Sequence, residues 1–241
     1  MLHLLFALGL SALPAFLLLR YFYRRDLERP EPLRLVGKSF LYGFLAVAPA
    51  AVIESVLLYF FAPADGLGGN LIQAFLIAAT VEESTKLFFV RHYLFRRAEF
   101  DERADGIIYA ICVSLGFAFV ENFLYGYRDT RVLLLRGITA VPLHAVATGV
   151  MGYYLGRARI DGLRDGKRHA AQAWKRGLVW AVAIHGGYDF FLLTGGLASL
   201  LVVPLLLCGW SLLKRLFRKA QVLDAADEFL SPFQKPPQSL P

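Results

Sequence analysis

The sequence predicts an all-α membrane protein, a bundle of about seven transmembrane helices. Of the 241 residues, 57% are hydrophobic and only 19% are charged, and the mean hydropathy is +0.51. A soluble domain carries more charge than this. Apolar segments recur along the chain, each close to the length that a hydrocarbon core of about 30 Å requires. The basic residues gather in every second loop between them.

The predicted spans follow one another with short connections. In chain order they are 2–19, 39–61, 71–90, 106–126, 133–156, 177–194 and 197–213. The last two are separated only by the segment 194–197, whose two glycines permit a tight turn. We expect residues 1–219 to form one transmembrane domain. Residues 220–241, which contain the adjacent Pro236 and Pro237, are expected to be a partly disordered cytoplasmic tail.

The loop charges predict the orientation in the membrane. Segments 20–38, 91–104, 157–176 and 214–241 hold 22 of the 26 lysines and arginines. Because basic loops stay in the cytoplasm, the N-terminus is predicted outside and the C-terminus inside. The first span has its charges after it, which is typical of a reverse anchor and not of a cleaved signal peptide. The net charge is +7, but the clustering of the basic residues in alternate loops argues against nucleic acid as a partner.

The third predicted span carries Glu82, Glu83 and Lys86 in its middle. A charge at that depth costs at least about 2.5 kcal/mol, so it needs a partner or a function. Glu82 and Lys86 are four residues apart and can form an ion pair on one helix face. A structural pair between helices explains one glutamate and the lysine. It does not explain the second glutamate. Two neighbouring carboxylates in an apolar site instead indicate that one of them acts as a general base.

Three further spans carry isolated polar residues. Glu121 and Asn122 lie in the fourth, His144 in the fifth, and His185 with Asp189 in the sixth. Each also has a structural explanation: a polar helix end, an interhelical hydrogen bond, or a His–Asp pair. Measured from the predicted span ends at 1.5 Å per residue, all lie within roughly 7–17 Å of the external surface. We therefore expect one polar pocket in the outer half of the bilayer, open to external water.

Glu54, in the second span, is a further intramembrane acid. A protonated carboxyl that hydrogen-bonds a neighbouring helix explains it, and the sequence assigns it no chemistry.

Four motifs carry a resemblance to a known family. They are Glu82-Glu83-x-x-Lys86, Phe117-x-x-x-Glu121-Asn122, the isolated His144, and His185-x-x-x-Asp189. Over about residues 70–190, their order and spacing resemble the PrsW family of bacterial intramembrane proteases. These are distant relatives of the CAAX prenyl endopeptidases and of the bacteriocin-processing enzymes.

The resemblance implies a multi-pass protease of the bacterial cytoplasmic membrane whose substrate is a membrane-anchored protein. In the best-known member the substrate is a single-pass anti-sigma factor, cut on its extracytoplasmic side. By resemblance, Glu82 is the base that activates water, Glu83 is its partner, and the histidines assist. Glu121 stands where the prenyl endopeptidases have a histidine, so their mechanism does not transfer simply.

Metal dependence divides the alternatives. The family has been described as metalloprotease-like, and His144, His185 and Glu121 are the residues that would hold zinc with an open position for water. The sequence lacks His-Glu-x-x-His, which places two ligands and a base on one helix face. We favour a metal-free glutamate protease over a zinc enzyme.

A proton-coupled transporter is the alternative of another class, because intramembrane Asp, Glu and His also form proton relays. The chain shows no inverted repeat of the kind that many transporters contain. A receptor or scaffold would not need Glu82, Glu83, Glu121 and His185 together.

Overall fold

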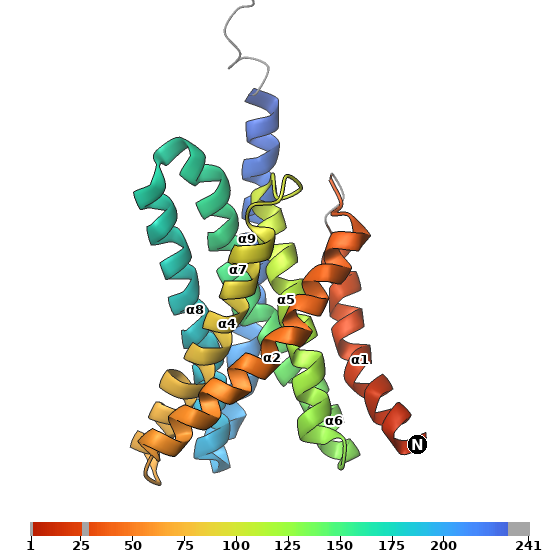
Figure 1. The fold of residues 1–241 in the computed structure, drawn as a ribbon, viewed down its shortest axis with the longest axis vertical. Helices are drawn as coiled ribbons and strands as arrows, with labels where there is room; N and C mark the ends of the chain where they lie inside the picture. The colour runs from red at the N-terminus through yellow and green to blue at the C-terminus, as the bar shows by residue number, and fades with distance from the viewer. Residues whose placement is uncertain (1, 26–28, 231–241) are drawn as a thin grey trace, which may run out of the picture.

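The protein is described by a computed structural model that covers residues 2–25 and 29–230, and these ranges contain helices joined by short connections and no strand (Figure 1). The N-terminal half contains α1 (Leu2–Tyr23), α2 (Leu33–Phe61), α3 (Leu67–Leu71), the π-helix η1 (Ile72–Ala79), α4 (Thr80–Phe89) and the π-helix η2 (Val90–Leu94). The C-terminal half contains α5 (Arg103–Gly126), α6 (Thr130–Ile138), α7 (Ala140–Asp165), α8 (Lys167–Thr194), the 3₁₀-helix η3 (Gly196–Leu201) and α9 (Val202–Leu230).

The predicted helical bundle is confirmed. Within the described residues, six helical stretches are long and apolar enough to cross a membrane. The remaining predicted span is the run from Leu67 to Leu94, in which α4 lies between two π-helical segments. The Thr80 hydroxyl donates to the carbonyl of Phe75, five residues earlier, at 2.6 Å, which fits the wider π-helical turn. Such π segments interrupt helices frequently at functional sites, and this one directly precedes Glu82.

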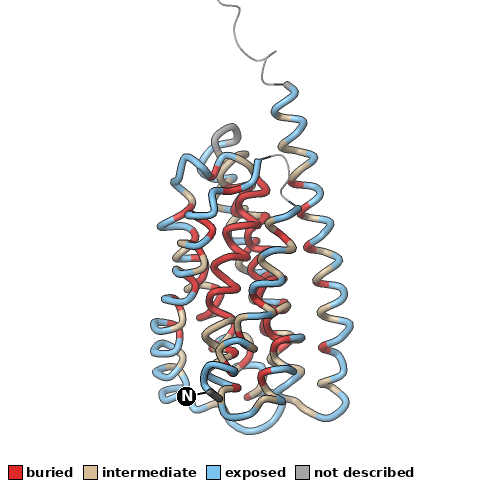
Figure 2. The backbone as a smooth tube through the Cα atoms, turned by 90° about the vertical axis from the view of Figure 1, so that its right-hand side faces the viewer, coloured by how far each residue is buried: buried red, intermediate tan, exposed pale blue. Residues whose placement is uncertain are grey.

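Helix α5 is the centre of the bundle and is buried on every side through its first two-thirds. Figure 2 shows this buried column flanked by helices with exposed outer faces. Glycines allow its neighbours to approach closely. A Cβ atom at Gly43 of α2 would lie 1.7 Å from the carbonyl oxygen of Val113, and one at Gly152 of α7 would lie 2.4 Å from that of Gly106. The close crossings fix α2 and α7 against α5.

The turn between α8 and η3 confirms the division of the last two spans. Gly195 and Gly196 have φ angles of +70° and +56°, in the left-handed region that only glycine adopts readily. The helices run further at the opposite end than the sequence predicted, because α8 begins at Lys167 and α9 continues to Leu230. Helix α9 therefore passes through the predicted domain boundary at residue 220. The rest of the predicted tail, 231–241, lies outside the described residues.

The basic connections share one end of the bundle. In Figure 1 the connections α1–α2, η2–α5 and α7–α8 and the end of α9 lie at the top, and the N-terminus lies at the opposite end. This arrangement agrees with the alternation of charge along the sequence. Which end faces the cytoplasm stays a prediction from the positive-inside rule.

Candidate active site

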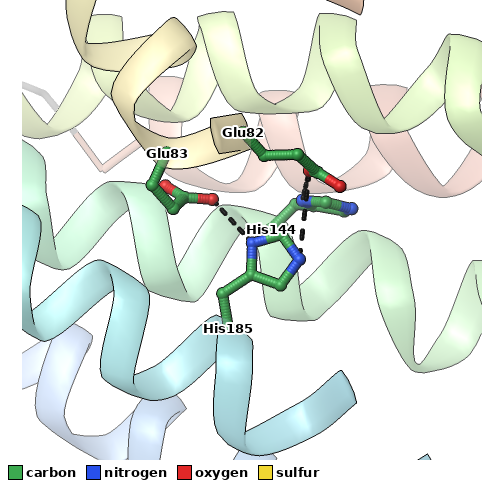
Figure 3. A group of neighbouring side chains, drawn as sticks. All are labelled: Glu82, Glu83, His144 and His185. Atoms are coloured by element: carbon green, nitrogen blue, oxygen red, sulfur yellow. Dashed lines mark hydrogen bonds and ion pairs between the residues drawn. The ribbon is translucent and has the colours of Figure 1, made fainter. Parts of the chain in front are cut away.

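Three helices bring four of the predicted catalytic residues together. Glu82 and Glu83 come from α4, His144 from α7 and His185 from α8, and their side chains converge in Figure 3. One ligand atom from each of the four lies within 4.8 Å of the others. All four side chains are buried. Residues more than 100 positions apart in the sequence thus form one polar cluster inside an apolar bundle.

Lys86 is the cation at the centre of this cluster. Its Nζ atom lies 2.8 Å from Glu83 Oε1, 3.1 Å from Glu82 Oε2 and 2.9 Å from His144 Nδ1. The ammonium also lies 4.3 Å from the centroid of the Phe117 ring, a cation–π contact. An ammonium has three hydrogens to donate, and these three acceptors use all of them. Lys86 therefore pairs with both glutamates and not only with the residue four positions away.

Glu83 is held by hydrogen bonds on both carboxylate oxygens. Oε1 contacts Lys86 and accepts from His185 Nδ1 at 2.9 Å, and Oε2 accepts from the Thr148 hydroxyl at 2.8 Å. The Ser114 hydroxyl lies 2.8 Å from that of Thr148 and extends this chain of contacts to α5. The Glu83 side chain is 0% exposed. Its position fixes both the imidazole of His185 and the charge of Lys86.

Glu82 is held less completely than Glu83. Only Oε2 contacts Lys86, and the same atom lies 3.9 Å from His144 Nδ1 and 3.9 Å from His185 Nε2. No residue in the described part of the chain hydrogen-bonds its Oε1 atom. The side chain retains 8% exposure. Glu82 is therefore the carboxylate of the pair with an oxygen free to accept a proton from water.

His144 is oriented through both ring nitrogens. Because the Lys86 ammonium can only donate, Nδ1 accepts, and Nε2 then carries the proton that is donated to Glu121 Oε2 at 2.6 Å. Arg136, at the end of α6, contacts the other oxygen of Glu121 at 2.9 Å. A carboxylate behind a histidine fixes its tautomer and orientation. Glu121, which the sequence offered as a zinc ligand, thus contacts His144 from outside the group of four.

Asp189 connects the cluster to the surface. Its Oδ2 atom lies 3.4 Å from His185 Nε2, as the spacing of four residues on α8 predicted. Exposure of the side chains falls from 24% at Asp189 and 16% at Glu121 to 8% at Glu82. Exposure of the cluster therefore increases toward Asp189 and Glu121, and Glu82 is the more exposed of the two glutamates.

Two polar residues noted in the sequence, Asn122 and Glu54, make no hydrogen bond to the cluster. Asn122 is wholly buried, and neither atom of its side-chain amide has a hydrogen-bond partner among the described residues. Glu54 on α2 lies within electrostatic range of Glu82, Glu121 and His185, and its Oε1 atom is buried without a partner in the same part of the chain. Glu54 therefore belongs to the electrostatic surroundings of the site, where the sequence assigned it no chemistry.

The sequence analysis missed Ser114, Thr148 and Arg136. Thr148 follows His144 by four residues and so lies on the same face of α7, a signal that was available. Hydroxyl groups in transmembrane helices commonly bond their own backbone, as Thr85 does with Val81 at 2.7 Å. Because such hydroxyl groups are common, the sequence did not single out Ser114 and Thr148, which support Glu83.

The cluster fits zinc by the type of its ligands. Imidazole and carboxylate groups are ligands that zinc takes at about 2.0–2.2 Å, and Glu121 and Glu83 contact the outer nitrogens of the two histidines as carboxylates do around bound zinc. His144 Nδ1, His185 Nε2 and a Glu82 oxygen are the atoms that would hold the ion. Lys86 Nζ now contacts two of these three residues, so zinc binding would require the ammonium to move.

Comparison with known proteins shows which family the sequence resembles. The sequence profile of a family described as "PrsW family intramembrane metalloprotease" matches residues 31–211. Protease PrsW of Geobacillus kaustophilus is 37% identical over 187 residues, covering 75% of this chain and 76% of the relative. Those of Bacillus subtilis and Halalkalibacterium halodurans are 36% and 33% identical, covering 74% and 88% of this chain and 79% and 95% of the relatives. No solved structure matches the chain.

Proposed function

Because the chain belongs to the PrsW family of intramembrane proteases, we propose that it is a glutamate-dependent endopeptidase that cuts a membrane-anchored protein. It is a multi-pass membrane protein whose relatives are bacterial proteases. The observation that carries the proposal is the contrast within the glutamate pair. Glu83 is hydrogen-bonded on both oxygens, whereas Glu82 has partial exposure and one oxygen that no described residue hydrogen-bonds.

In the proposed reaction, Glu82 accepts a proton from a water molecule, and the resulting hydroxide attacks the carbonyl carbon of the scissile peptide bond. A carbon–oxygen bond forms, and the carbonyl oxygen becomes an oxyanion. His185 acts here as an imidazolium: Nδ1 donates to Glu83, and Nε2, which lies between Glu82 and Asp189, is the group placed to donate to the oxyanion. The carbon–nitrogen bond then breaks, and the proton held by Glu82 passes to the leaving amine.

The surrounding residues keep these groups in position. Glu83 accepts from Nδ1 of His185 and so directs Nε2 toward the reaction centre. Lys86 neutralises part of the charge of the two glutamates in an apolar environment, where an unpaired carboxylate is costly. Glu121 and Arg136 hold His144 from the other side. The site is therefore organised before substrate binds, which is the condition for electrostatic stabilisation of a transition state.

The proposed substrate is a single-pass membrane protein, such as an anti-sigma factor. Its transmembrane helix must unwind before a peptide bond can reach Glu82, and unpaired backbone groups are costly in hydrocarbon. Exposure of the cluster increases toward Asp189 and Glu121. We therefore place the cut in the external juxtamembrane part, or the outer few residues, of the substrate's helix.

A zinc-dependent protease is the second candidate, supported by the four ligand atoms within 4.8 Å. Bound zinc would supply a polarised water and a Lewis acid for the carbonyl oxygen. The central position of Lys86 favours the metal-free proposal, because a second cation held by Glu82 and His144 would lie next to the ammonium.

The test uses purified protein in lipid vesicles with a tagged single-pass substrate, with activity and bound zinc measured on the same sample. The proposal expects cleavage that survives prolonged chelation and zinc well below one ion per chain. It also expects Lys86→Met to raise zinc affinity while lowering activity, because this change frees the ligand atoms. One zinc per active chain, lost with activity on chelation, would establish the metal-dependent alternative. Cleavage products mapped by mass spectrometry to the opposite half of the substrate's helix would contradict the proposed position of the cut.

A further inference from the structure

A pocket of about 540 Å³ lies between the end of α1 and the middle of α9, away from the proposed active site. Four basic residues line it: Arg24 and Arg25, which directly follow α1, and Lys214 and Arg218 from α9. These segments are about 190 positions apart in the sequence, and the fold brings their charges to one place. We call this surface the basic pocket.

The four cations lack acidic partners within the described residues. Elsewhere at this end of the bundle, Arg29 pairs with Glu102 and Glu228, and Arg103 pairs with Asp161 and Asp224. In the basic pocket, the Arg25 guanidinium makes a cation–π contact with Tyr21 at 4.4 Å, and the four cations form no ion pair with the described residues. Positive charge gathered in a shared recess favours an anionic ligand.

Aromatic side chains form the wall of the pocket and bridge the two helices. The ring of Phe22 lies 5.4 Å from that of Trp210 and 6.2 Å from that of Phe217, measured between centroids. Phe22 and Phe217 also line the basic pocket. A ligand there would meet an aromatic surface on one side and cations on the other.

The position of the pocket along the helices sets it at the membrane surface. The stretch of α1 that could span a membrane ends at Tyr23, and in α9 twelve uncharged residues, 202–213, precede Lys214. The pocket lies where both stretches end, at the level of the lipid headgroups. Basic pockets between transmembrane helices on the positively charged side are sites where lipid phosphates bind.

We propose that the basic pocket binds the phosphate of an anionic phospholipid. The guanidinium and ammonium groups would contact the phosphate oxygens, and the acyl chains would extend along the apolar surfaces of α1 and α9. One bound lipid would connect the N-terminal and C-terminal spans, which in this region meet mainly through aromatic side chains. The same chemistry would accept free phosphate, so the experiment separates the two sources.

The test compares two sets of substitutions that remove equal charge from the same helices. The pocket set is Arg24→Gln, Lys214→Gln and Arg218→Gln. The control set is Arg20→Gln, Arg215→Gln and Lys219→Gln, three exposed cations on α1 and α9 that do not line the pocket. Each protein is placed in nanodiscs of phosphatidylcholine with roughly one-fifth phosphatidylglycerol, and the lipids that remain bound are identified by native mass spectrometry.

We expect the wild type and the control set to retain phosphatidylglycerol in preference to phosphatidylcholine, and the pocket set to lose this preference by about tenfold or more. An equal loss in both sets would mean general attraction to an anionic surface and would overturn the proposal. The proposal would also be overturned if the wild type retained the two lipids in the same ratio as they have in the nanodisc.

Two further measurements keep the result decisive. Inorganic phosphate added to nanodiscs of pure phosphatidylcholine should raise the melting temperature less than phosphatidylglycerol does, and an equal rise would assign the pocket to free phosphate. If the pocket set does not fold, the single change Arg24→Gln should still reduce phosphatidylglycerol retention relative to Arg20→Gln. Equal retention by these two single variants would refute the proposal.

Discussion

Two buried clusters in this bundle each place one cation among acidic side chains, but the acidic groups are held differently. In the first, Lys86 lies among Glu82, Glu83 and His144, deep between α4 and α7. In the second, at the basic end of the bundle, Arg103 lies among acidic residues of α7 and α9. Its guanidinium contacts Asp161 at 2.7 Å, Asp224 at 2.9 Å and Asp227 at 2.8 Å.

The difference lies in how the acidic groups are held. Arg103 presents five donors in a planar fork, so several carboxylates are bonded at once. Asp224 also accepts from the backbone nitrogens of Arg103 and Ala104 at 3.0 and 3.1 Å, which holds α9 at the start of α5. Lys86 has three donors for its three acceptors, and Glu82 keeps one oxygen without a partner in the described chain.

This comparison separates a charge cluster that holds helices together from one that can perform chemistry. Both carry the cost of burying ions, which is repaid only by well-formed contacts. In the Arg103 cluster the contacts tie the start of α5 to α7 and α9. In the Lys86 cluster the contacts are concentrated on Glu83, and Glu82 remains available. We infer that structure and catalysis are divided between the two glutamates in this way.

The largest expected effect is the loss of activity in Glu82→Gln. Glutamine keeps the shape of glutamate but cannot take a proton from water, so the cleavage rate should fall by about 10²–10⁴. Thermal stability and substrate binding should change little, because Glu82 makes few contacts. Substrate cleavage in vesicles measures this, with Glu99→Gln, at an exposed site, as the matched control. Wild-type turnover in folded Glu82→Gln protein would remove Glu82 from the mechanism.

The next effect distinguishes the two cations. Arg103→Met removes the guanidinium that contacts Asp161, Asp224 and Asp227, and breaking a buried ion pair costs about 3–5 kcal/mol. We expect a large fall in melting temperature, while cleavage per folded molecule stays near the wild-type value. Lys86→Met should lower both stability and cleavage, because its ammonium contacts two glutamates in the proposed active site. Equal loss of cleavage per folded molecule in the two variants would mean that the clusters are not functionally distinct.

The sequence predicted the helices because long apolar segments indicate membrane spans. It predicted the polar cluster because charged residues within such spans are costly and therefore rare. Long apolar segments in a chain of 241 residues and charges within them are informative without any tertiary information. The spacing of four residues correctly placed Asp189 beside His185. The order and spacing of the motifs also identified the family correctly.

Other features depended on contacts between distant segments, which spacing does not encode. The extension of α9 to Leu230 is held by Asp224 against Arg103, 121 positions away. Thr148 reaches Glu83 across 65 positions, and Arg136 reaches Glu121 from a separate short helix. Local pattern gives the face of a helix, but the partner on that face is set only when the helices pack. The different contacts of Glu82 and Glu83 therefore could not be predicted from the sequence.

The smallest expected effect tests that division directly through Thr148→Val. Valine matches the volume of threonine but removes the hydroxyl that donates to Glu83 Oε2 at 2.8 Å. Stability should fall by about 0.5–1.5 kcal/mol, as for one hydrogen bond, and cleavage should fall several-fold because Glu83 positions His185. Thr85→Val is the matched control, since its hydroxyl bonds the Val81 carbonyl on its own helix. Melting temperature and cleavage rate are measured for both variants. If Thr148→Val loses stability but keeps full cleavage, Glu83 is a structural residue only, and the Lys86 cluster resembles the Arg103 cluster more closely than we infer.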